Sequence, residues 1–382
     1  MPFREETAMD QKVAFVVLAR QGVMPFSRLC AKYGVSRACG YKWLLRYQQA
    51  GSVAALAEQS RRPHHSPTQT PRALVERVVA LRRDHSWGAR KLKVLLAQEG
   101  ITLGEATINR VLAREGLVAP RQPRPAPRRF VRPECNQLWQ MDFKGEYPLA
   151  DGMCYPLGLL DDHSRYLMGL WPLADQQAAT TQAVLEPLFR EVGVPQAMLV
   201  DHGVPWWGSG NGFGLTRFAV WLMQQDIELI YAAVRHPQTS GKLERQNRTL
   251  KERTASVGRP ESWSDWQDWV RYYRWEYNEI RPHEAVGLVP PAQVYTLANL
   301  RPYQERPREW EYGDACTARL NSAGCLYWRR RQYFVCEALA EQWVRLDELD
   351  GLLVVTFRRT TLREINLRTG ETRPVALSQR FQ

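Results

Sequence analysis

The sequence predicts a multidomain chain with a helical N-terminal third, an α/β core and a small all-β C-terminal part. Helix-like segments with capping residues occupy residues 11–118. Strand-like and helix-like segments follow one another over 137–280, and short strand-like runs separated by Gly and Asp begin at 313. Helices bury one stripe and strands one face, so the apolar period distinguishes the three parts.

The positive charge of the chain is concentrated in its first third. The 382 residues are 44% hydrophobic and 24% charged with a net charge of +12. Residues 1–135 hold 24 Lys and Arg against 10 Asp and Glu, whereas residues 136–382 hold 28 against 30. A basic block beside a near-neutral body is typical of phosphate binding, and a solvated, solubilising surface is the alternative.

The composition argues against several classes of protein. No apolar run approaches the ~20 residues that cross a bilayer, and the first residues lack the apolar segment of a signal peptide. The seven cysteines are scattered without a Cys-x-x-Cys pair. That spacing indicates a reducing compartment and argues against a disulfide framework or a structural zinc site.

Residues 1–58 are predicted to form a helix-turn-helix domain. Helices are expected at 12–20, 26–33 and 36–47. Gly34 suits the turn, and Ser36 can cap the third helix. The exposed cations of that helix, which we expect to contact DNA, are Arg37, Lys42 and Arg46. A plain three-helix bundle is the alternative, and the charge bias favours DNA binding.

A second helix-turn-helix or winged-helix domain is expected at 72–118, between two linkers. Its helices are predicted at 72–83, 88–100 and 105–114, and its candidate DNA-binding cations are Arg90, Lys91 and Lys93. The linker at 59–71 contains three prolines and no apolar period. The linker at 119–135 is basic and rich in proline, and we expect its Arg128 and Arg129 to run along a DNA backbone.

Residues 136–298 are predicted to form an α/β sheet covered by helices. Strands are expected at 137–147, 155–161, 164–172, 197–201 and 227–232, and helices at 175–192, 215–225 and from Glu244 onward. Three consecutive strands followed by alternating helices and strands are typical of such a sheet. Residues 262–280 are expected to be a helix whose Trp and Tyr recur every three or four positions, which favours a packed face over a cofactor site.

Residues 299–382 are predicted to form a small all-β barrel or a sandwich. Strands are expected at 313–322, 325–336, 342–347, 351–358 and 362–367. The run Arg329-Arg330-Arg331 in this part either contacts DNA or is only solvated.

Three acidic residues are the candidate catalytic site: Asp142 within a strand, Asp201 at a strand end and Glu244 at a helix start. Two Mg²⁺ ions about 4 Å apart can activate a nucleophile, stabilise a leaving oxygen and hold the two in line, and such ions prefer carboxylate ligands. We expect Asp142 to bridge the ions, Asp201 to complete one and Glu244 the other. Three ordinary surface carboxylates are the alternative.

The helix that contains Glu244 also carries groups suited to phosphates, including Asn247 on the same face. The predicted DNA contacts on and beside this face are Lys242, Arg245, Arg248 and Lys251. Asp161 and Asp162 are rival acids, but they lie at a hairpin turn, where Asp is common for backbone reasons. A structural role is favoured for them, with Arg165 as an ion-pair partner of one.

Residues 136–296 resemble the integrase catalytic core shared by retroviral integrases and many bacterial insertion-sequence transposases. The motifs that carry the resemblance are Trp139-x-x-Asp142, Asp161-x-x-Ser164-Arg165, Asp201-x-Gly203, His236-Pro237-Gln238-x-x-Gly241-Lys242-x-Glu244-Arg245-x-Asn247-x-x-Leu250-Lys251, Tyr277-Asn278-x-x-Arg281-Pro282-His283 and Pro290-Pro291. The order of domains is similar to that of a single-frame insertion-sequence transposase. The resemblance implies a ribonuclease H-like core whose DDE triad is Asp142, Asp201 and Glu244.

The resemblance further implies a Mg²⁺-dependent transposase, with Mn²⁺ as a substitute, that cuts at insertion-sequence ends and joins the freed 3′-OH to target DNA. Its implied partners are double-stranded DNA, as terminal inverted repeats and target, and further copies of itself in a dimer or tetramer. A cytoplasmic, nucleoid-associated bacterial protein without a membrane partner is expected. The alternatives are a catalytically silent DNA-binding regulator derived from a transposase and a structure-specific nuclease without a joining step.

The chain departs from the family pattern beside the second acid. His202 follows Asp201 where the family often has Asn, and Asp201 and Glu244 are 43 positions apart, a longer gap than is common. Residues 204–214, with four glycines, look like an insertion. A plain surface loop is the favoured interpretation. The alternative, which makes Trp206 and Trp207 candidate DNA contacts, is that both rings are exposed and stack on an unpaired base at a transposon end.

Overall fold

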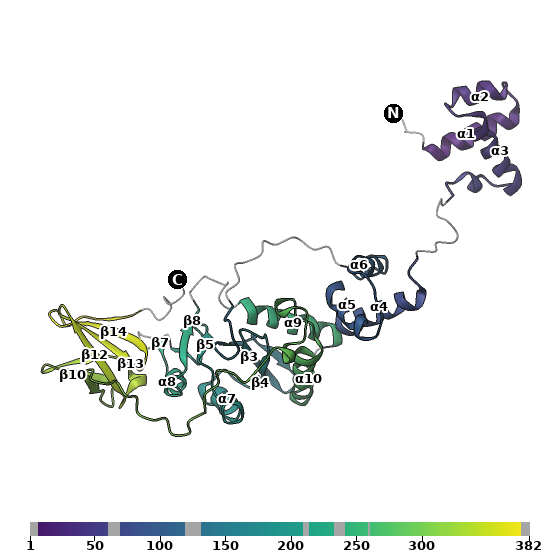
Figure 1. The fold of residues 1–382 in the computed structure, drawn as a ribbon. Helices are drawn as coiled ribbons and strands as arrows, with labels where there is room; N and C mark the ends of the chain where they lie inside the picture. Colours follow the sequence, from purple (N-terminus) through teal and green to yellow (C-terminus); the bar gives the residue numbers. More distant parts are fainter. Residues whose placement is uncertain are drawn as a thin grey trace. The chain divides into compact units, whose positions relative to one another are not determined.

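The chain folds into two compact units, Met1–Pro71 and Arg72–Gln382. The computed structural model describes residues 7–59, 69–118, 131–208, 214–232, 241–258 and 260–375 (Figure 1). The boundary between the units falls at the end of the linker predicted at 59–71. Most of that linker, and most of the linker at 119–135 with Arg128 and Arg129, lies outside the described residues.

The N-terminal unit is a three-helix domain whose helices match the predicted ones. Its elements are α1 (Ala8–Gln21), α2 (Phe26–Lys32), α3 (Arg37–Ala50) and the short 3-10 helix η1 (Val53–Leu56). Phe15, Leu29 and Leu56 are fully buried among them. The hydroxyl of Ser36 accepts a hydrogen bond from the amide of Cys39 at 3.2 Å, which caps α3 as the sequence predicts.

The second unit begins with a further helical block. It contains α4 (Arg72–His85), α5 (Ala89–Gln98) and α6 (Glu105–Arg114). Val78, Leu92, Leu96 and Ile108 are fully buried in their common core. The three helices predicted between 72 and 118 are thereby confirmed.

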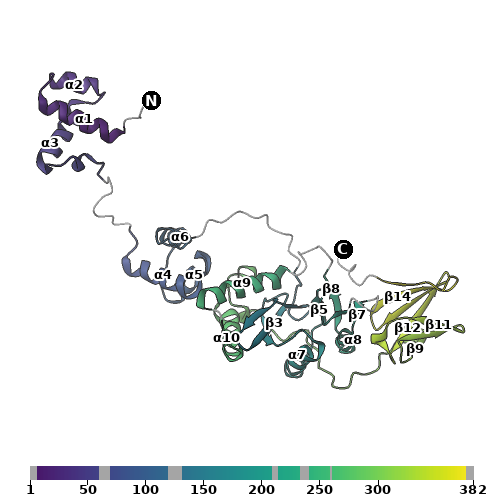
Figure 2. The same ribbon diagram turned by 180° about the vertical axis from the view of Figure 1, so that it is seen from behind.

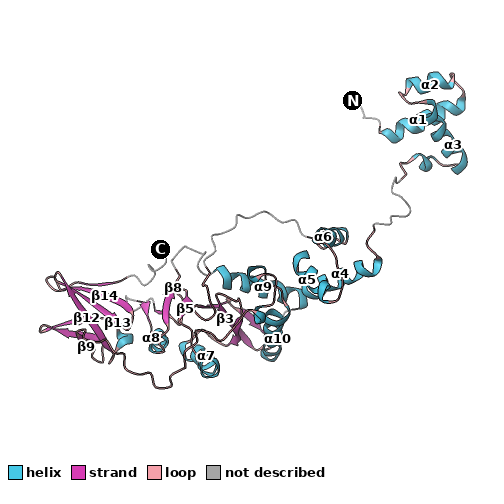
Figure 3. Ribbon diagram, viewed as in Figure 1, coloured by secondary structure: helices cyan, strands magenta, loops and turns pink. Residues whose placement is uncertain are grey.

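A six-stranded mixed sheet forms the centre of the second unit (Figure 3). Its strands are β1 (Trp139–Phe143), β2 (Tyr147–Leu149), β3 (Gly152–Asp161), β4 (Leu167–Leu173), β5 (Ala197–Val200) and β8 (Glu228–Tyr231). β3 lies between β1 and β4 and is antiparallel to both, whereas β1, β5 and β8 run parallel. The loop after β5 adds a small ribbon, β6 (Trp207–Gly208) and β7 (Gly214–Leu215).

Helices cover both faces of this sheet. They are α7 (Ala178–Val192), α8 (Arg217–Gln224), α9 (Gly241–Val257) and α10 (Trp263–Trp275), and α10 continues into a π-helical turn, Glu276–Ile280. α7 and α8 share an apolar cluster with Trp139 and Met141 of β1, whereas α9 and α10 share another with β3 and β4. Successive strand residues face opposite sides, so Gln140 and Asp142 point to the α9 side. The α/β class predicted for this part is confirmed.

The Trp- and Tyr-rich helix α10 packs one face, as its spacing predicts. Trp266 and Tyr273 are buried, while Tyr272 and Trp275 are exposed on the other side. Among the described residues, no helix is both long and apolar enough to cross a membrane.

The C-terminal part is built of short antiparallel strands. They are β9 (Thr317–Arg319), β10 (Cys325–Trp328), β11 (Arg331–Phe334), β12 (Trp343–Leu349), β13 (Leu352–Phe357), β14 (Thr360–Asn366) and β15 (Thr372–Pro374), with a 3-10 turn, η6 (Glu337–Leu339). The sheet order is β15-β14-β13-β12-β9, and β10 pairs with β11. Within the described ranges β15 and β9 end the order without pairing, so closure into a barrel stays a prediction.

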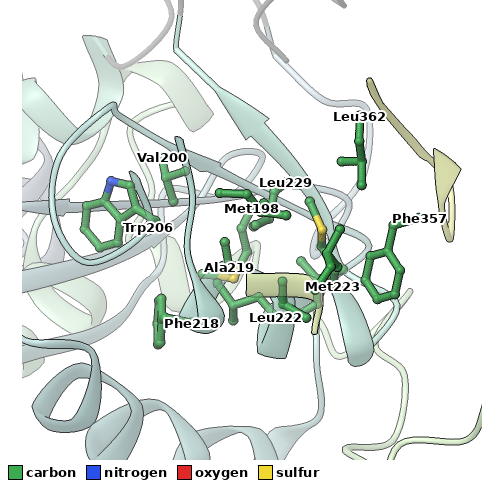
Figure 4. Close-up of a cluster of buried hydrophobic side chains, with 14 of the residues drawn as sticks. Met198, Val200, Trp206, Phe218, Ala219, Leu222, Met223, Leu229, Phe357 and Leu362 are labelled. Carbon is green, nitrogen blue, oxygen red and sulfur yellow. The ribbon is translucent and has the colours of Figure 1, made fainter. Parts of the chain in front are cut away.

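The C-terminal sheet packs beside α8 of the core, as both ribbon views show (Figures 1 and 2). Phe357 of β13 and Leu362 of β14 belong to the same apolar cluster as Met223 of α8 (Figure 4). That cluster continues to Met198 of β5 and Trp206, next to one of the candidate acids. The β part and the central sheet therefore share one apolar core.

Candidate active site

Asp142 and Asp201 are brought side by side by the pairing of two parallel strands. Asp142 is the fourth residue of β1, and Asp201 directly follows β5. In the register of these strands Gln140 pairs with Leu199. The same offset places Asp142 level with Asp201, and neighbouring strands lie about 4.8 Å apart. The two acids therefore lie at the carboxyl ends of adjacent strands.

Helix α9 is attached to β1 at two points, one on each side of Glu244. The amide of Leu243 donates to Oε1 of Gln140 at 3.3 Å, and Nδ2 of Asn247 donates to Oδ2 of Asp142 at 3.1 Å. Two strand residues span about 6.6 Å and four helix residues about 6 Å, so the two contacts hold strand and helix in register. Glu244 therefore lies in the first turn of α9 near Asp142, with its side chain exposed.

One oxygen of Asp201 is fixed by two donors from its own loop. Oδ1 accepts hydrogen bonds from the amide of Gly203 at 2.8 Å and from the indole Nε1 of Trp206 at 2.6 Å. A Cβ at position 203 would lie 2.8 Å from the same oxygen, so glycine leaves the room that the carboxylate needs. The loop after β5 thus orients Asp201, although the residue is exposed to solvent.

Asp142 is influenced electrostatically by the other two candidate acids. The pKa of Asp142 is raised to about 7, first by burial and then by the negative charges of Asp201 and Glu244. Acids that are far apart in the sequence are therefore neighbours in the fold, on the elements that the sequence analysis named.

The donor set suits a hard divalent cation. Carboxylates that repel one another are stabilised by a positive ion between them, and such ions prefer oxygen ligands. Oδ1 of Asn247 is buried and has no hydrogen-bond partner among the described residues. As placed, no three His, Cys, Asp or Glu side chains in the described ranges lie close enough to hold a metal ion together. The residues fit the chemistry, and the carboxylates would have to converge further to enclose an ion.

The rival acids Asp161 and Asp162 are fully buried and belong to the fold. Asp161 pairs with Trp139, the first residue of β1, and Trp139 lies three positions before Asp142 in the chain. It accepts hydrogen bonds from the amides of Asn136 and Ser164 at 2.8 Å and from the Ser164 hydroxyl at 2.6 Å. A buried carboxylate with this many donors supports its surroundings, in agreement with the structural role that the sequence favours.

Lys242 does not face solvent as expected of a DNA contact. Its ammonium forms an ion pair with the buried Asp162, which also accepts from Nε2 of Gln140 and the amide of Arg132 at 2.8 Å each. Burial lowers the pKa of Lys242 to about 8. The expectation that Lys242 binds DNA is therefore corrected, because this side chain attaches the start of α9 to the end of β3.

The other cations predicted on α9 lie on its surface. Arg245, Arg248 and Lys251 are exposed. Arg248 lies 3.8 Å from Glu252, a loose surface pair that holds the side chain only weakly. These three residues stay predicted DNA contacts beside the candidate acids.

The cations predicted in the first helical domain occupy the surface of α3. Arg37 and Lys42 are exposed, and Arg46 is half-buried and donates to Oε1 of Gln59 at 3.0 Å. In the second helical block Lys93 is exposed on α5. Contact of these residues with DNA stays a prediction.

Arg90 and Lys91 lie at the start of α5, where Arg90 is exposed and Lys91 is half-buried. Arg90 is 3.3 Å from Glu105 and 3.8 Å from Glu284. The pKa of Lys91 is lowered to about 7, mainly by burial and then by the charge of Arg281. Contact of Arg90 and Lys91 with DNA stays a prediction.

Trp206 is the main departure from the predicted site. An exposed ring is predicted at this position, but only 1% of the surface of Trp206 is accessible. Its ring stacks on Phe143 with 5.7 Å between centroids, and its carbonyl accepts from the hydroxyl of Tyr231 at 3.2 Å. A ring buried in this way has no free face for a base, so that role is wrong for Trp206. Trp207 is half-buried, and its DNA contact stays a prediction.

Three side chains, the buried Arg253 and Glu276 and the half-buried His85, link the second helical block to α9, and no sequence pattern indicated them. Glu276 accepts from Nε and Nη2 of Arg253 at 2.9 and 3.1 Å and lies 2.7 Å from Nδ1 of His85. Arg253 belongs to α9, so this group connects α4 to the helix that carries Glu244. Only the folded chain brings these three positions together, and their sequence spacing gives no signal.

Known domain families match the chain over most of its N-terminal and central parts. A helix-turn-helix domain matches residues 11–64, and a homeodomain-like domain matches residues 39–112. Integrase core domains match residues 132–237 and 225–291. The three candidate acids lie within these last two ranges.

Individual proteins are also similar to the chain. An uncharacterised 39.2 kDa protein of insertion element IS476 from Xanthomonas euvesicatoria is 26% identical over 268 residues, which is 68% of this chain and 75% of that protein. A candidate transposase of insertion sequence element IS986/IS6110 from Mycobacterium tuberculosis is 26% identical over 234 residues, 54% of this chain and 81% of its own. The Pro-Pol polyprotein of feline foamy virus is 30% identical over 125 residues, 32% of this chain but only 10% of the polyprotein.

Proposed function

We propose that the chain cleaves DNA at the ends of its element and transfers the freed strand into target DNA. The chain belongs to the insertion-sequence transposases that contain an integrase core of ribonuclease H-like fold. The observation on which this proposal rests is that Asp142, Asp201 and Glu244 come from three different elements and lie near one another. Strand register, a helix contact and mutual charge repulsion all support it.

Each acid suits a different part of the task. Asp142 has the least freedom, because β1 and the amide of Asn247 both hold it, and it is the candidate for a shared ligand. Asp201 has Oδ1 fixed by its loop, which leaves Oδ2 to bind. Glu244 is exposed on the first turn of α9 and has the freedom to adjust.

Mg²⁺, with Mn²⁺ as a substitute, is the proposed cofactor of this site. When bound, divalent ions activate a hydroxyl nucleophile and stabilise the leaving oxygen of the phosphodiester. The nucleophile is water in the cleavage step and the freed 3′-OH in the joining step. The chain holds the acids at the ends of β1 and β5 and on α9. A bound cation would favour the ionised form of Asp142, whose pKa is raised without it.

The helical domains and α9 supply the proposed contacts with DNA. Arg37 and Lys42 lie exposed on α3, as a helix that enters the major groove requires. Arg245, Arg248 and Lys251 extend along α9 from Glu244 and suit the phosphates near the cut. Because two ends must be joined in one event, a dimer or tetramer on paired ends is part of the proposal.

The test of this function is strand transfer of a labelled terminal-repeat oligonucleotide in the presence of Mg²⁺. Asp142→Asn should give no joined product, whereas Asp268→Asn, the same change at an exposed acid of α10, should match the wild type. Equal product from wild type and Asp142→Asn would exclude the catalytic assignment.

The same assay separates the proposal from its two alternatives. A silent DNA-binding regulator would bind the repeat, but its wild type would give no product. A nuclease without a joining step would give cut ends and no joined strand. Arg37→Ala together with Lys42→Ala should weaken repeat binding and lower the salt dependence of the binding constant by about 0.9 per lost phosphate contact.

A further inference from the structure

We propose that Trp206 is a positioning residue, whose indole N–H turns Asp201 so that its second oxygen faces the candidate cation site. The inference rests on the proposed function, because it assigns Asp201 a role toward the cation. It also gives the buried tryptophan of the insertion a function that the sequence did not suggest.

Among the residues that the structure describes, the hydrogen bonds of Asp201 are all on one oxygen. Nε1 of Trp206 at 2.6 Å and the amide of Gly203 at 2.8 Å both donate to Oδ1. Bonds to an ionised carboxylate are shorter and stronger than bonds between neutral groups. With Oδ1 occupied on two sides, a ligand approaching Asp201 meets Oδ2. An indole has one N–H donor and no acceptor, so Trp206 cannot bind the cation itself.

Trp206 is held from several elements at once. Its ring stacks on Phe143, which follows Asp142 in β1, at an interplanar angle of 19°. Its carbonyl accepts from the hydroxyl of Tyr231 at the end of β8. The side chain is 1% exposed and lies in the apolar core that Figure 4 shows. A donor fixed in this way cannot follow Asp201 if the carboxylate swings toward solvent.

Without such a donor, charge repulsion would turn the Asp201 carboxylate away from the candidate cation site. Asp201 is exposed, follows the last residue of β5, and lies close enough to Asp142 for their charges to interact, and Glu244 acts on the same Asp142. Before a cation binds, repulsion favours orientations that turn Asp201 away from the other two acids. A fixed donor opposes that rotation and organises the site before the ligand arrives.

Trp206→Phe tests the hydrogen bond because it keeps an aromatic ring in the core and removes only the donor. We expect Mn²⁺ to bind the metal-free protein about 10-fold more weakly, as measured by electron paramagnetic resonance, because partners that orient metal ligands usually contribute this much. Strand transfer should fall and recover in part at higher Mn²⁺ concentration.

The matched control is Trp139→Phe. Trp139 is also fully buried, and its indole donates to the side-chain oxygen of Asn136 at 2.9 Å, away from the acids. This variant loses the same kind of bond and should keep wild-type Mn²⁺ affinity. If Trp139→Phe weakens binding as much as Trp206→Phe, the effect is general loosening and the proposal is wrong.

Gly203→Ala is a second variant that acts on the same oxygen from the other side. The backbone of Gly203 does not need a positive φ, so the strain from alanine falls on the Asp201 carboxylate, and most strongly on Oδ1. It should also weaken Mn²⁺ binding. Wild-type affinity in both Trp206→Phe and Gly203→Ala would overturn the proposal. If Asp201→Asn itself binds Mn²⁺ normally, the proposed function fails instead.

Discussion

The sheet carries two acidic clusters that differ in how completely the protein satisfies them. Asp161 and Asp162 are fully buried and accept bonds from amides, a hydroxyl, a carboxamide and an ammonium. Asp142, Asp201 and Glu244 are half-buried or exposed and keep oxygens that face solvent or one another. A carboxylate saturated by protein donors supports the fold, and one with open oxygens is available to a ligand.

The two clusters are separated by only a short stretch of one strand. Gln140 donates to Asp162 and accepts from the first turn of α9, while Asp142, two residues later on the same face, contacts Asn247. The identity of a residue as an acid therefore does not decide its role, and the donors around it do. Substitutions in the two clusters should therefore have different effects, from a large loss of activity to a small loss of stability.

The largest effect is expected from Glu244→Gln, which keeps shape and removes the charge of an open acid. Losing a ligand of the proposed cation site should slow strand transfer by about 10³-fold or more, because transition-state charge is then stabilised by several kcal/mol less. The rate is measured with labelled repeat DNA on protein whose circular dichroism is native. A rate within 10-fold of the wild type would assign Glu244 to the surface.

The next effect concerns stability and should come from the saturated cluster. Lys242→Met leaves the buried Asp162 without its cation and should lower the free energy of unfolding by about 3 kcal/mol, as for other broken buried pairs. Urea denaturation measures it. Lys251→Met, at an exposed position of the same helix, is the control and should change little. Equal effects of the two substitutions would contradict the comparison.

The open cluster should instead gain stability when a charge is removed. The pKa of Asp142 in the folded protein, about 7, lies above the value of about 3.9 for an unstructured aspartate, so ionisation disfavours folding as pH rises between these values. Asp142→Asn imitates the neutral form. At about pH 8 and in the presence of a chelator, the substitution should raise the free energy of unfolding by about 2 kcal/mol, a value that allows for screening by solvent. Below about pH 4 it should leave the free energy of unfolding unchanged.

The outcome that would refute the raised pKa is a stability gain of Asp142→Asn that does not depend on pH. Addition of Mg²⁺ should reverse the order, because only the wild type keeps the full set of carboxylates. The measurement is urea denaturation at several pH values with and without the metal.

A smaller effect is expected from Ser164→Ala. It removes one donor to Asp161 but keeps the backbone amide that donates to the same carboxylate. Stability should fall by about 1 kcal/mol, the usual net contribution of one hydrogen bond, and Mn²⁺ affinity should be unchanged. Weaker Mn²⁺ binding in this variant would mean that the two clusters are coupled.

Much of the fold followed from local patterns in the sequence. The helices from α1 to α6 have caps, turns and apolar periods that are readable one segment at a time. The succession of strands and helices along the core, and the elements that carry Asp142, Asp201 and Glu244, followed from the apolar pattern, whereas the order of strands within the sheet did not. The mutual placement of these acids depends on the register of β1 and β5, which no local pattern contains.

What the sequence did not predict depends on contacts between distant residues. Trp206 follows a proline in a loop with many glycines, where no period shows whether a ring faces the core or the solvent. Lys242 is a cation whose partner, Asp162, lies 80 residues earlier in the chain. Barrel closure likewise depends on pairing between the first and last strands of the C-terminal part.

The central claim is that open carboxylates bind the cation and saturated ones do not. Mn²⁺ titration of metal-free wild type, Asp201→Asn and Asp162→Asn, at a temperature where all three keep native circular dichroism, tests it most directly. Both substitutions remove one carboxylate charge from the same sheet. Asp201→Asn should bind Mn²⁺ at least about 10-fold more weakly, and Asp162→Asn should bind like the wild type. Equal weakening in both, or weakening in Asp162→Asn alone, would contradict the account.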